Sequence, residues 1–139
     1  MTFPASIPLS DHHRESASIL VVEDDIALRF TLASWLRLLG YIVLEAACAD
    51  EASVLLASPI PVDLIITDVE MPGRMQGEDF VQYLRKIFPA LPLIVVSGGI
   101  RRADLGACVF FRKPYNLEDM ALCIERLLPE AVSEVEHAQ

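Results

Sequence analysis

The chain has 139 residues, of which 53% are hydrophobic, and its formal net charge is −9 at pH 7. This length and apolar content suit one domain with its own core. The acidic balance argues against nucleic acid as a direct partner, because phosphate binding needs clustered Lys and Arg. No apolar run approaches the roughly 18 residues of a membrane span. The N-terminus also lacks a signal-peptide pattern, so we expect a cytoplasmic protein.

Residues 1–17 are rich in Pro, Ser and charge and are expected to form a flexible tail. After them, short apolar runs alternate with segments of helical periodicity. The expected order is strand 18–22, helix 26–39, strand 41–44, helix 50–57, strand 62–67, helix 77–88, strand 91–96, strand 109–111, and a last helix capped by Asn116. Segment 98–108 is ambiguous, and 129–139 is expected to be an acidic tail. The folded domain is therefore predicted to span residues 18–128.

The first predicted helix shows the clearest apolar face. Its inward positions are expected to be Leu28, Leu32, Trp35, Leu36 and Leu39, which recur at helical spacing. The glycine that follows, at position 40, is expected to end the helix.

Five strands that alternate with helices predict an α/β fold with a parallel sheet. Right-handed crossovers then place helices on both faces, which gives a doubly wound sheet. In such sheets, ligands bind outside the carboxyl ends of the strands. Functional residues are therefore expected directly after the strands.

Polar residues follow four of the five predicted strands. They are Glu23, Asp24 and Asp25 after the first, Asp68 after the third, Ser97, Gly98 and Gly99 after the fourth, and Lys113 after the fifth. Each alone has an ordinary explanation, since acids before a helix often cap it and an aspartate before Pro-Gly often serves the turn. Together they would face one crevice if the sheet order switches between the first and third strands. The combination predicts a functional site.

The residue types indicate the chemistry of this site. Carboxylates held together repel one another unless a cation joins them, and Mg²⁺ suits oxygen ligands and phosphate. Lys113 offers a compact positive charge and Ser97 a hydroxyl, and both groups can contact phosphoryl oxygens. Asp68 is then a nucleophile that can carry a phosphoryl group as an acyl phosphate.

These motifs resemble those of the receiver domain of two-component response regulators. The resemblance rests on VVEDD (21–25), LIITDVEMPG (64–73), PLIVVSGG (92–99) and FFRKP (110–114), and it covers residues 18–128. It implies a five-stranded, (βα)5 flavodoxin-like fold with strand order 2-1-3-4-5. It also implies that a sensor histidine kinase or a histidine phosphotransfer protein supplies the phosphoryl group from a phosphohistidine.

The resemblance also implies a metal site. Asp68 matches the phosphoacceptor, and Asp24 and Asp25 match the acidic pair that holds Mg²⁺ together with it. Glu70 would contribute its backbone carbonyl to the metal.

The remaining matches concern the switch that phosphorylation operates. Ser97 corresponds to the switch Ser/Thr that closes onto the phosphoryl group, and Phe110 stands at the aromatic switch position. Lys113 matches the family's lysine, and its bond to Pro114 is expected to be cis.

Three departures from the family pattern stand out. The loop from Asp68 to Gly77 is one residue longer than the commonest spacing. The segment between Ser97 and Lys113 is short, so a shortened fourth helix is expected. Phe110 lacks the hydroxyl of the tyrosine that is common there. Because only a short acidic tail follows, we expect a stand-alone receiver that signals to an unknown downstream protein.

Three other readings remain open. One is a receiver-like adaptor that is not phosphorylated, and another is a sink for phosphoryl groups. The third is a phosphohydrolase of the haloacid dehalogenase type, whose nucleophile follows the first strand in a DxD motif. Here the acids after the first strand are adjacent and the isolated aspartate follows the third strand, so a turnover enzyme is not expected.

Overall fold

The computed structural model describes residues 17–70, 77–99 and 108–128. In the described part, the elements are β1 (Ser18–Val22), α2 (Ile26–Leu38), β2 (Ile42–Ala46), α3 (Ala49–Ala57), β3 (Leu64–Asp68), α4 (Gly77–Ile87), β4 (Leu93–Ser97), β5 (Val109–Arg112) and α5 (Leu117–Leu127). All strand pairs are parallel, and the order is β2-β1-β3-β4-β5. The predicted doubly wound α/β fold is confirmed.

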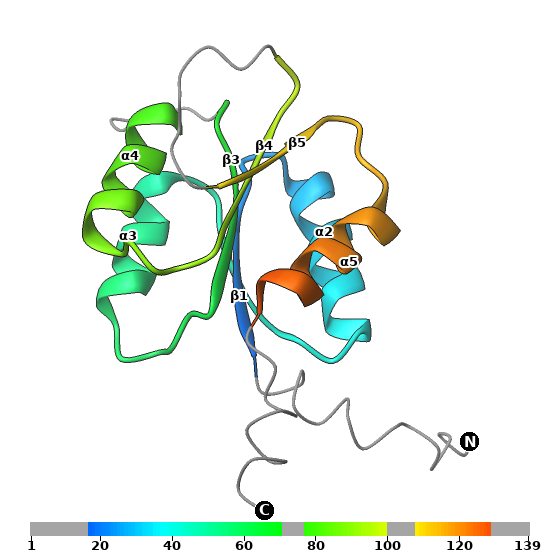
Figure 1. The fold of residues 1–139 in the computed structure, drawn as a ribbon, viewed down its shortest axis with the longest axis horizontal. Coiled ribbons are helices and arrows are strands. Elements are labelled where there is room, and N and C mark those ends of the chain that lie inside the picture. The colour runs from blue at the N-terminus through cyan, green and yellow to red at the C-terminus, as the bar shows by residue number, and fades with distance from the viewer. Residues whose placement is uncertain (1–16, 71–76, 100–107, 129–139) are drawn as a thin grey trace, which may run out of the picture.

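Helices cover both faces of the sheet (Figure 1). Helices α2 and α5 pack on one face, and α3 and α4 pack on the other. Strand β1 serves both layers, because successive side chains point to opposite faces. Ile19 and Val21 belong to the core beneath α2 and α5, whereas Leu20 and Val22 belong to the core beneath α3 and α4. Both layers therefore hold the carboxyl end of β1 in place.

Most predicted elements are found within one or two residues of their expected bounds. Four strands end one or two residues later than predicted, and the most important extension is that of β3, which ends at Asp68 itself. The parallel ladder pairs Asp68 with Val96 of β4, so the backbone of the candidate nucleophile is fixed by the sheet. Gly40 has a φ of 102°, a conformation that favours glycine, and the predicted end of α2 is confirmed.

The predicted inward face of α2 is only partly right. Leu32 and Leu36 are buried, but Leu28 is 46% exposed and Leu39 is 39% exposed. Leu28 lies in the first turn, close to where the strands end, and Leu39 caps the last turn. Helical periodicity identifies the face of a helix, but it does not tell how far along the helix the sheet extends.

Among the described residues, no helix is both long and apolar enough to cross a lipid bilayer. Most of the predicted tails and most of the segment expected to contain a shortened fourth helix lie outside the described residues. The domain boundaries at 18 and 128 and the shortened helix stay predictions.

Candidate functional site

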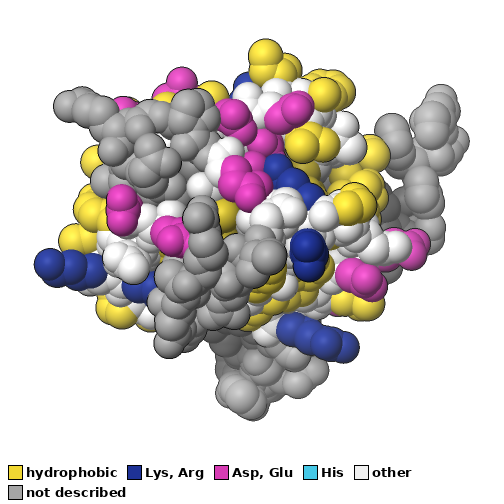
Figure 2. Space-filling view, turned by 90° about the horizontal axis from the view of Figure 1, so that it is seen from above, with side chains coloured by type: hydrophobic (Ala, Val, Ile, Leu, Met, Phe, Trp, Pro, Cys, Tyr) yellow, Lys and Arg dark blue, Asp and Glu magenta, His cyan; other side chains and the backbone are white. Residues whose placement is uncertain are grey.

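The carboxyl ends of the central strands bring the predicted site residues together. Val22 pairs with Thr67, so the carboxyl ends of β1 and β3 lie next to each other. The residues that follow this pair are Glu23 and Asp68. The Lys113 amide donates to the Ser97 carbonyl at 2.8 Å, which continues the β4–β5 pairing into the loop. Viewed from above, this edge of the sheet carries a gathering of acidic side chains beside a basic one (Figure 2).

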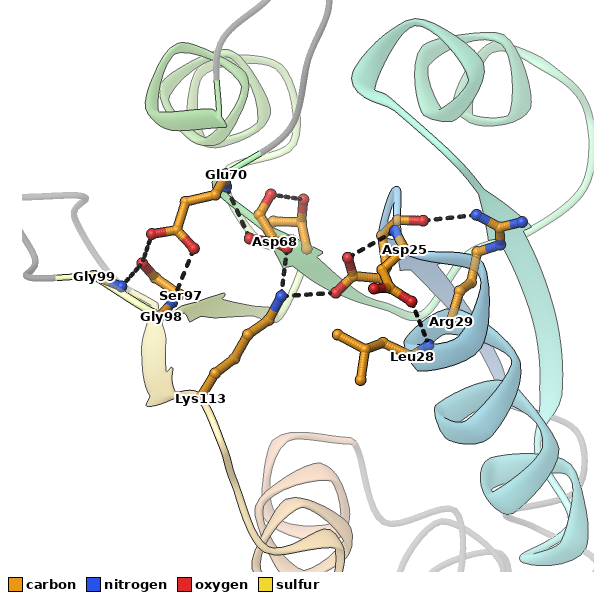
Figure 3. Close-up of polar contacts among 11 residues, drawn as sticks. Asp25, Leu28, Arg29, Asp68, Glu70, Ser97, Gly98, Gly99 and Lys113 are labelled. Atoms are coloured by element: carbon orange, nitrogen blue, oxygen red, sulfur yellow. Dashed lines mark hydrogen bonds and ion pairs between the residues drawn. The ribbon is translucent and has the colours of Figure 1, made fainter.

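Lys113 links the two buried carboxylates of the site. Its Nζ donates to Asp68 Oδ2 at 2.6 Å and to Glu23 Oε1 at 3.0 Å. Asp68 is 3% exposed and Glu23 is 8% exposed. Two buried carboxyl groups therefore share one cation, as Figure 3 shows for Asp68 and Lys113.

The electrostatics of this cluster shift two pKa values. Burial raises the pKa of Glu23 to about 7, and the nearby Asp68 adds to the rise, while hydrogen bonds from the Asp25 amide and Lys113 work in the opposite direction. Burial alone would lower the pKa of Lys113, but its hydrogen bonds to Asp68 and Glu23 outweigh burial, so the pKa lies above its ordinary value. At neutral pH the lysine is charged.

Three carboxylates lie close enough to ligate one cation. Glu23, Asp24 and Asp68 each offer an oxygen, and these oxygens are within 4.8 Å of one another. Asp24 is exposed to solvent, whereas the other two are buried. Such an oxygen-rich donor set fits Mg²⁺, which uses few carboxylates and keeps several waters.

The structure does not bring Asp25 into this group. Its carboxylate accepts a hydrogen bond of 3.0 Å from the Leu28 amide and caps the start of α2. Figure 3 shows the Asp25 side chain directed at this helix terminus. Glu23 was expected after the first strand, but no individual role was assigned to it from the sequence. In the structure it lies beside Asp68 and binds Lys113. The signal in the sequence was its position directly after the strand.

Glu70 contributes more than the backbone group expected of it. Its amide donates to Asp68 Oδ1 at 2.8 Å, and its carboxylate reaches across to the end of β4. There Oε2 accepts from the Ser97 hydroxyl at 2.9 Å and Oε1 accepts from the Gly98 amide at 2.9 Å (Figure 3). The Gly98 hydrogen bond is the main cause that lowers the pKa of Glu70.

The predicted switch residues occupy neighbouring strands. Ser97 is 3% exposed at the end of β4. Phe110, in β5, is partly buried and packs against the core beneath α3 and α4. The peptide bond between Lys113 and Pro114 is cis, as predicted.

The fold and the charged site at its carboxyl edge together define a receiver-type domain. The family described as the response regulator receiver domain matches residues 19–125, and the chain belongs to this family. It is therefore a receiver domain of two-component signalling.

Solved structures agree with this assignment. The receiver domain of the hybrid histidine kinase CckA is 32% identical, with a TM-score of 0.69 and coverage of 81% of this chain and 100% of that one. Chemotaxis protein CheY4 of Vibrio cholerae is 30% identical, with a TM-score of 0.71 and coverage of 81% and 98%. The Thermotoga maritima response regulator TrrA, solved in complex with Mg²⁺ and BeF, is 26% identical, with a TM-score of 0.72 and coverage of 81% and 100%.

Curated relatives include longer proteins. The transcriptional regulator NtrC of Azospirillum brasilense is 36% identical over 121 residues, which cover 81% of this chain and 24% of that protein. The response regulator MprA of Mycolicibacterium vanbaalenii is 37% identical over 116 residues, which cover 79% and 49%. The chain thus spans a half or less of the length of these two relatives.

Proposed function

We propose that Asp68 accepts a phosphoryl group from a phosphohistidine on a sensor histidine kinase or a histidine phosphotransfer protein. An Asp68 oxygen forms a bond to phosphorus while the phosphorus–nitrogen bond of the donor breaks, and the imidazole leaves with the electron pair and takes a proton. The observation that carries the proposal is the buried Asp68 carboxylate at a strand end, 2.6 Å from the Lys113 ammonium. Lys113 neutralises charge that develops on the transferring group.

We further propose that Glu23, Asp24 and Asp68 hold Mg²⁺, with the backbone carbonyl of Glu70. A bound Mg²⁺ supplies charge neutralisation at the phosphoryl oxygens. The three carboxylates support this assignment because their oxygens lie within 4.8 Å of one another. Asp25 is left out of the proposed ligand set because the first turn of α2 engages its carboxylate.

Substitutions in the acidic segment test this ligand set. We expect Asp24→Asn to weaken Mg²⁺ binding at least tenfold, about the loss that follows the removal of one charged ligand. Asp25→Asn is expected to leave Mg²⁺ affinity within about threefold, because asparagine still caps a helix well. Isothermal titration with Mg²⁺ measures both. Equal losses in the two variants would contradict the assignment.

The phosphoryl group is proposed to recruit the Ser97 hydroxyl, because a charge-assisted hydrogen bond to an anionic oxygen is strong. The Phe110 side chain is proposed to change its position when the end of β4 rearranges. The two movements together change the surface that a downstream protein contacts. We propose that the protein is cytoplasmic and does not turn over small substrates. An assay on small phosphate esters tests the last point, and sustained hydrolysis would contradict it.

A groove beside the site is the proposed docking position for the phosphoryl donor. It has a volume of about 460 Å³ and lies between α2 and the start of α5, with Leu28, Tyr115 and Lys113 in its lining. Lys113 contacts both this groove and Asp68, so a protein that fills the groove brings its phosphohistidine next to the acceptor.

Leu28→Ser is expected to slow transfer from a phosphohistidine protein about tenfold, because the variant loses an apolar contact at the docking face. Loading from acetyl phosphate, which needs no docking, should stay the same. The control is Val54→Ser, at an exposed valine of α3 on the opposite face of the sheet. Several phosphorylated histidine-containing donor domains are first compared with the wild type. The donor that transfers its phosphoryl group to the wild type at the highest rate is then used for all variants. Equal slowing by Val54→Ser would contradict the proposed docking position.

Intact-mass measurement after incubation with acetyl phosphate and Mg²⁺ tests the function itself. A single added phosphoryl group that is absent when EDTA is present supports the proposal. A folded protein that gains no mass with acetyl phosphate or with any phosphohistidine donor would instead be a receiver-like adaptor.

A further inference from the structure

We propose that the Glu70 side chain competes with the phosphoryl group for the hydrogen-bond donors at the end of β4. The inference rests on the proposed function and gives the Glu70 carboxylate a role in that same site. Loading of Asp68 would then require this carboxylate to leave, so Glu70 sets how readily the domain is phosphorylated.

The carboxylate is bound in the way that this site would bind an anion. Its two oxygens accept from the Ser97 hydroxyl and from the Gly98 amide, each at 2.9 Å. The Ser97 oxygen also accepts from the Gly99 amide at 3.0 Å, so its own hydrogen is directed to Glu70. A serine hydroxyl has only one hydrogen to donate. Ser97 therefore cannot donate to Glu70 and to a phosphoryl oxygen at the same time.

Glycine at position 99 allows this close approach. A Cβ atom built on Gly99 would lie 2.9 Å from Glu70 Oε2, closer than real Cβ contacts. The atom it would meet is the far end of a flexible, solvent-exposed side chain. An alanine at this position is thus expected to displace the carboxylate while the backbone stays in place.

Glu70 is tied to the phosphoacceptor through its backbone as well. Its amide donates to Asp68 Oδ1 at 2.8 Å, so the side chain starts from a fixed point next to the acceptor. Because the side chain is exposed, it can turn into water when a phosphoryl group arrives. The carboxylate would then act as a removable occupant, while the backbone carbonyl of Glu70 keeps its proposed place at the metal.

The first test compares wild type with Glu70→Ala and Glu70→Asp in two measurements. These are the rate of loading from acetyl phosphate by intact mass, and the affinity for beryllofluoride with Mg²⁺ by ¹⁹F NMR. We expect both variants to exceed wild type by roughly fivefold to tenfold, about the net effect of one ordinary hydrogen bond, because the Glu70 side chain is exposed to solvent. Aspartate keeps the charge but is too short to reach Ser97. If Glu70→Asp behaves as wild type while Glu70→Ala gains, charge repulsion explains the effect and the competition is overturned.

Two further variants locate the competition. Gly99→Ala should raise loading in the same direction as Glu70→Asp, although it leaves Glu70 in the chain. In a Ser97→Ala background, the gain from Glu70→Asp should shrink, because the contested hydroxyl is gone. An undiminished gain in that background would overturn the role of Ser97.

A readout without metal or phosphoryl donor separates this inference from the proposed function. In the metal-free protein, the Gly98 amide resonance should move and exchange faster with solvent in Glu70→Asp, because it loses its acceptor. An unchanged Gly98 amide would overturn the contact. Equal loading of wild type and Glu70→Ala would overturn the inference but leave the proposed function standing. No loading and no beryllofluoride binding by any variant would overturn both.

Discussion

Asp68→Asn will gain no phosphoryl group from acetyl phosphate and Mg²⁺ under conditions in which the wild type gains one. The amide lacks the nucleophilic carboxylate oxygen, so no acyl phosphate can form. The fold should persist, because the amide oxygen still accepts hydrogen bonds from the Lys113 ammonium or the Glu70 amide, which bind Asp68 in the wild type. Intact mass and circular dichroism together measure the expected result.

Asp63→Asn is the matched control for this experiment. Asp63 is a second aspartate close to a strand, but it lies before β3, at the opposite end from the site, where it accepts from the Ser18 amide. The Asp63→Asn variant should gain a phosphoryl group as fully as the wild type. Phosphoryl uptake by Asp68→Asn at the wild-type level would show that another residue is the acceptor.

Lys113→Met is expected to lower the free energy of unfolding of the metal-free protein by about 1–3 kcal/mol. The substitution removes the cation that bridges Asp68 and Glu23 and leaves two buried carboxylates side by side. The loss lies below that for a fully buried ion pair, because the Lys113 side chain is 22% exposed. Urea denaturation in the presence of EDTA measures the change.

Lys86→Met controls for the general loss of a lysine, since this lysine is exposed on α4 and should change stability by less than about 0.5 kcal/mol. Addition of Mg²⁺ should recover part of the stability of Lys113→Met, because a second cation then lies among the carboxylates. If the two variants were equally stable in EDTA, the bridge seen in the structure would contribute nothing to folding.

The position of Asp68, Ser97 and Lys113 could be predicted from the sequence because it depends on a general property of parallel sheets. The carboxyl ends of the strands meet at one edge, so residues directly after the strands become neighbours once the strand order is known. The apolar runs were long enough to identify the strands, and an error of one or two residues in their bounds did not change which edge the polar residues reach.

The acidic segment after β1 was harder to predict, because three consecutive acids differ only in the direction of their side chains. That direction depends on where α2 begins. The helix starts at Ile26, so Asp25 becomes its N-cap and turns to the Leu28 amide, while Glu23 is left beside Lys113. The side-chain contacts of Glu70 could not be predicted either, because they depend on the separation between the end of β4 and the loop after β3.

The acidic groups at the carboxyl edge of the sheet have a consequence for how the stability of the protein depends on dissolved ions. An ion that binds only the folded state raises stability in proportion to the logarithm of its concentration above the dissociation constant. Since Glu23, Asp24 and Asp68 offer oxygens within 4.8 Å of one another, the melting temperature should rise with the concentration of free Mg²⁺. A simple melting curve can therefore serve as a titration of the site, with no kinase and no phosphoryl donor needed.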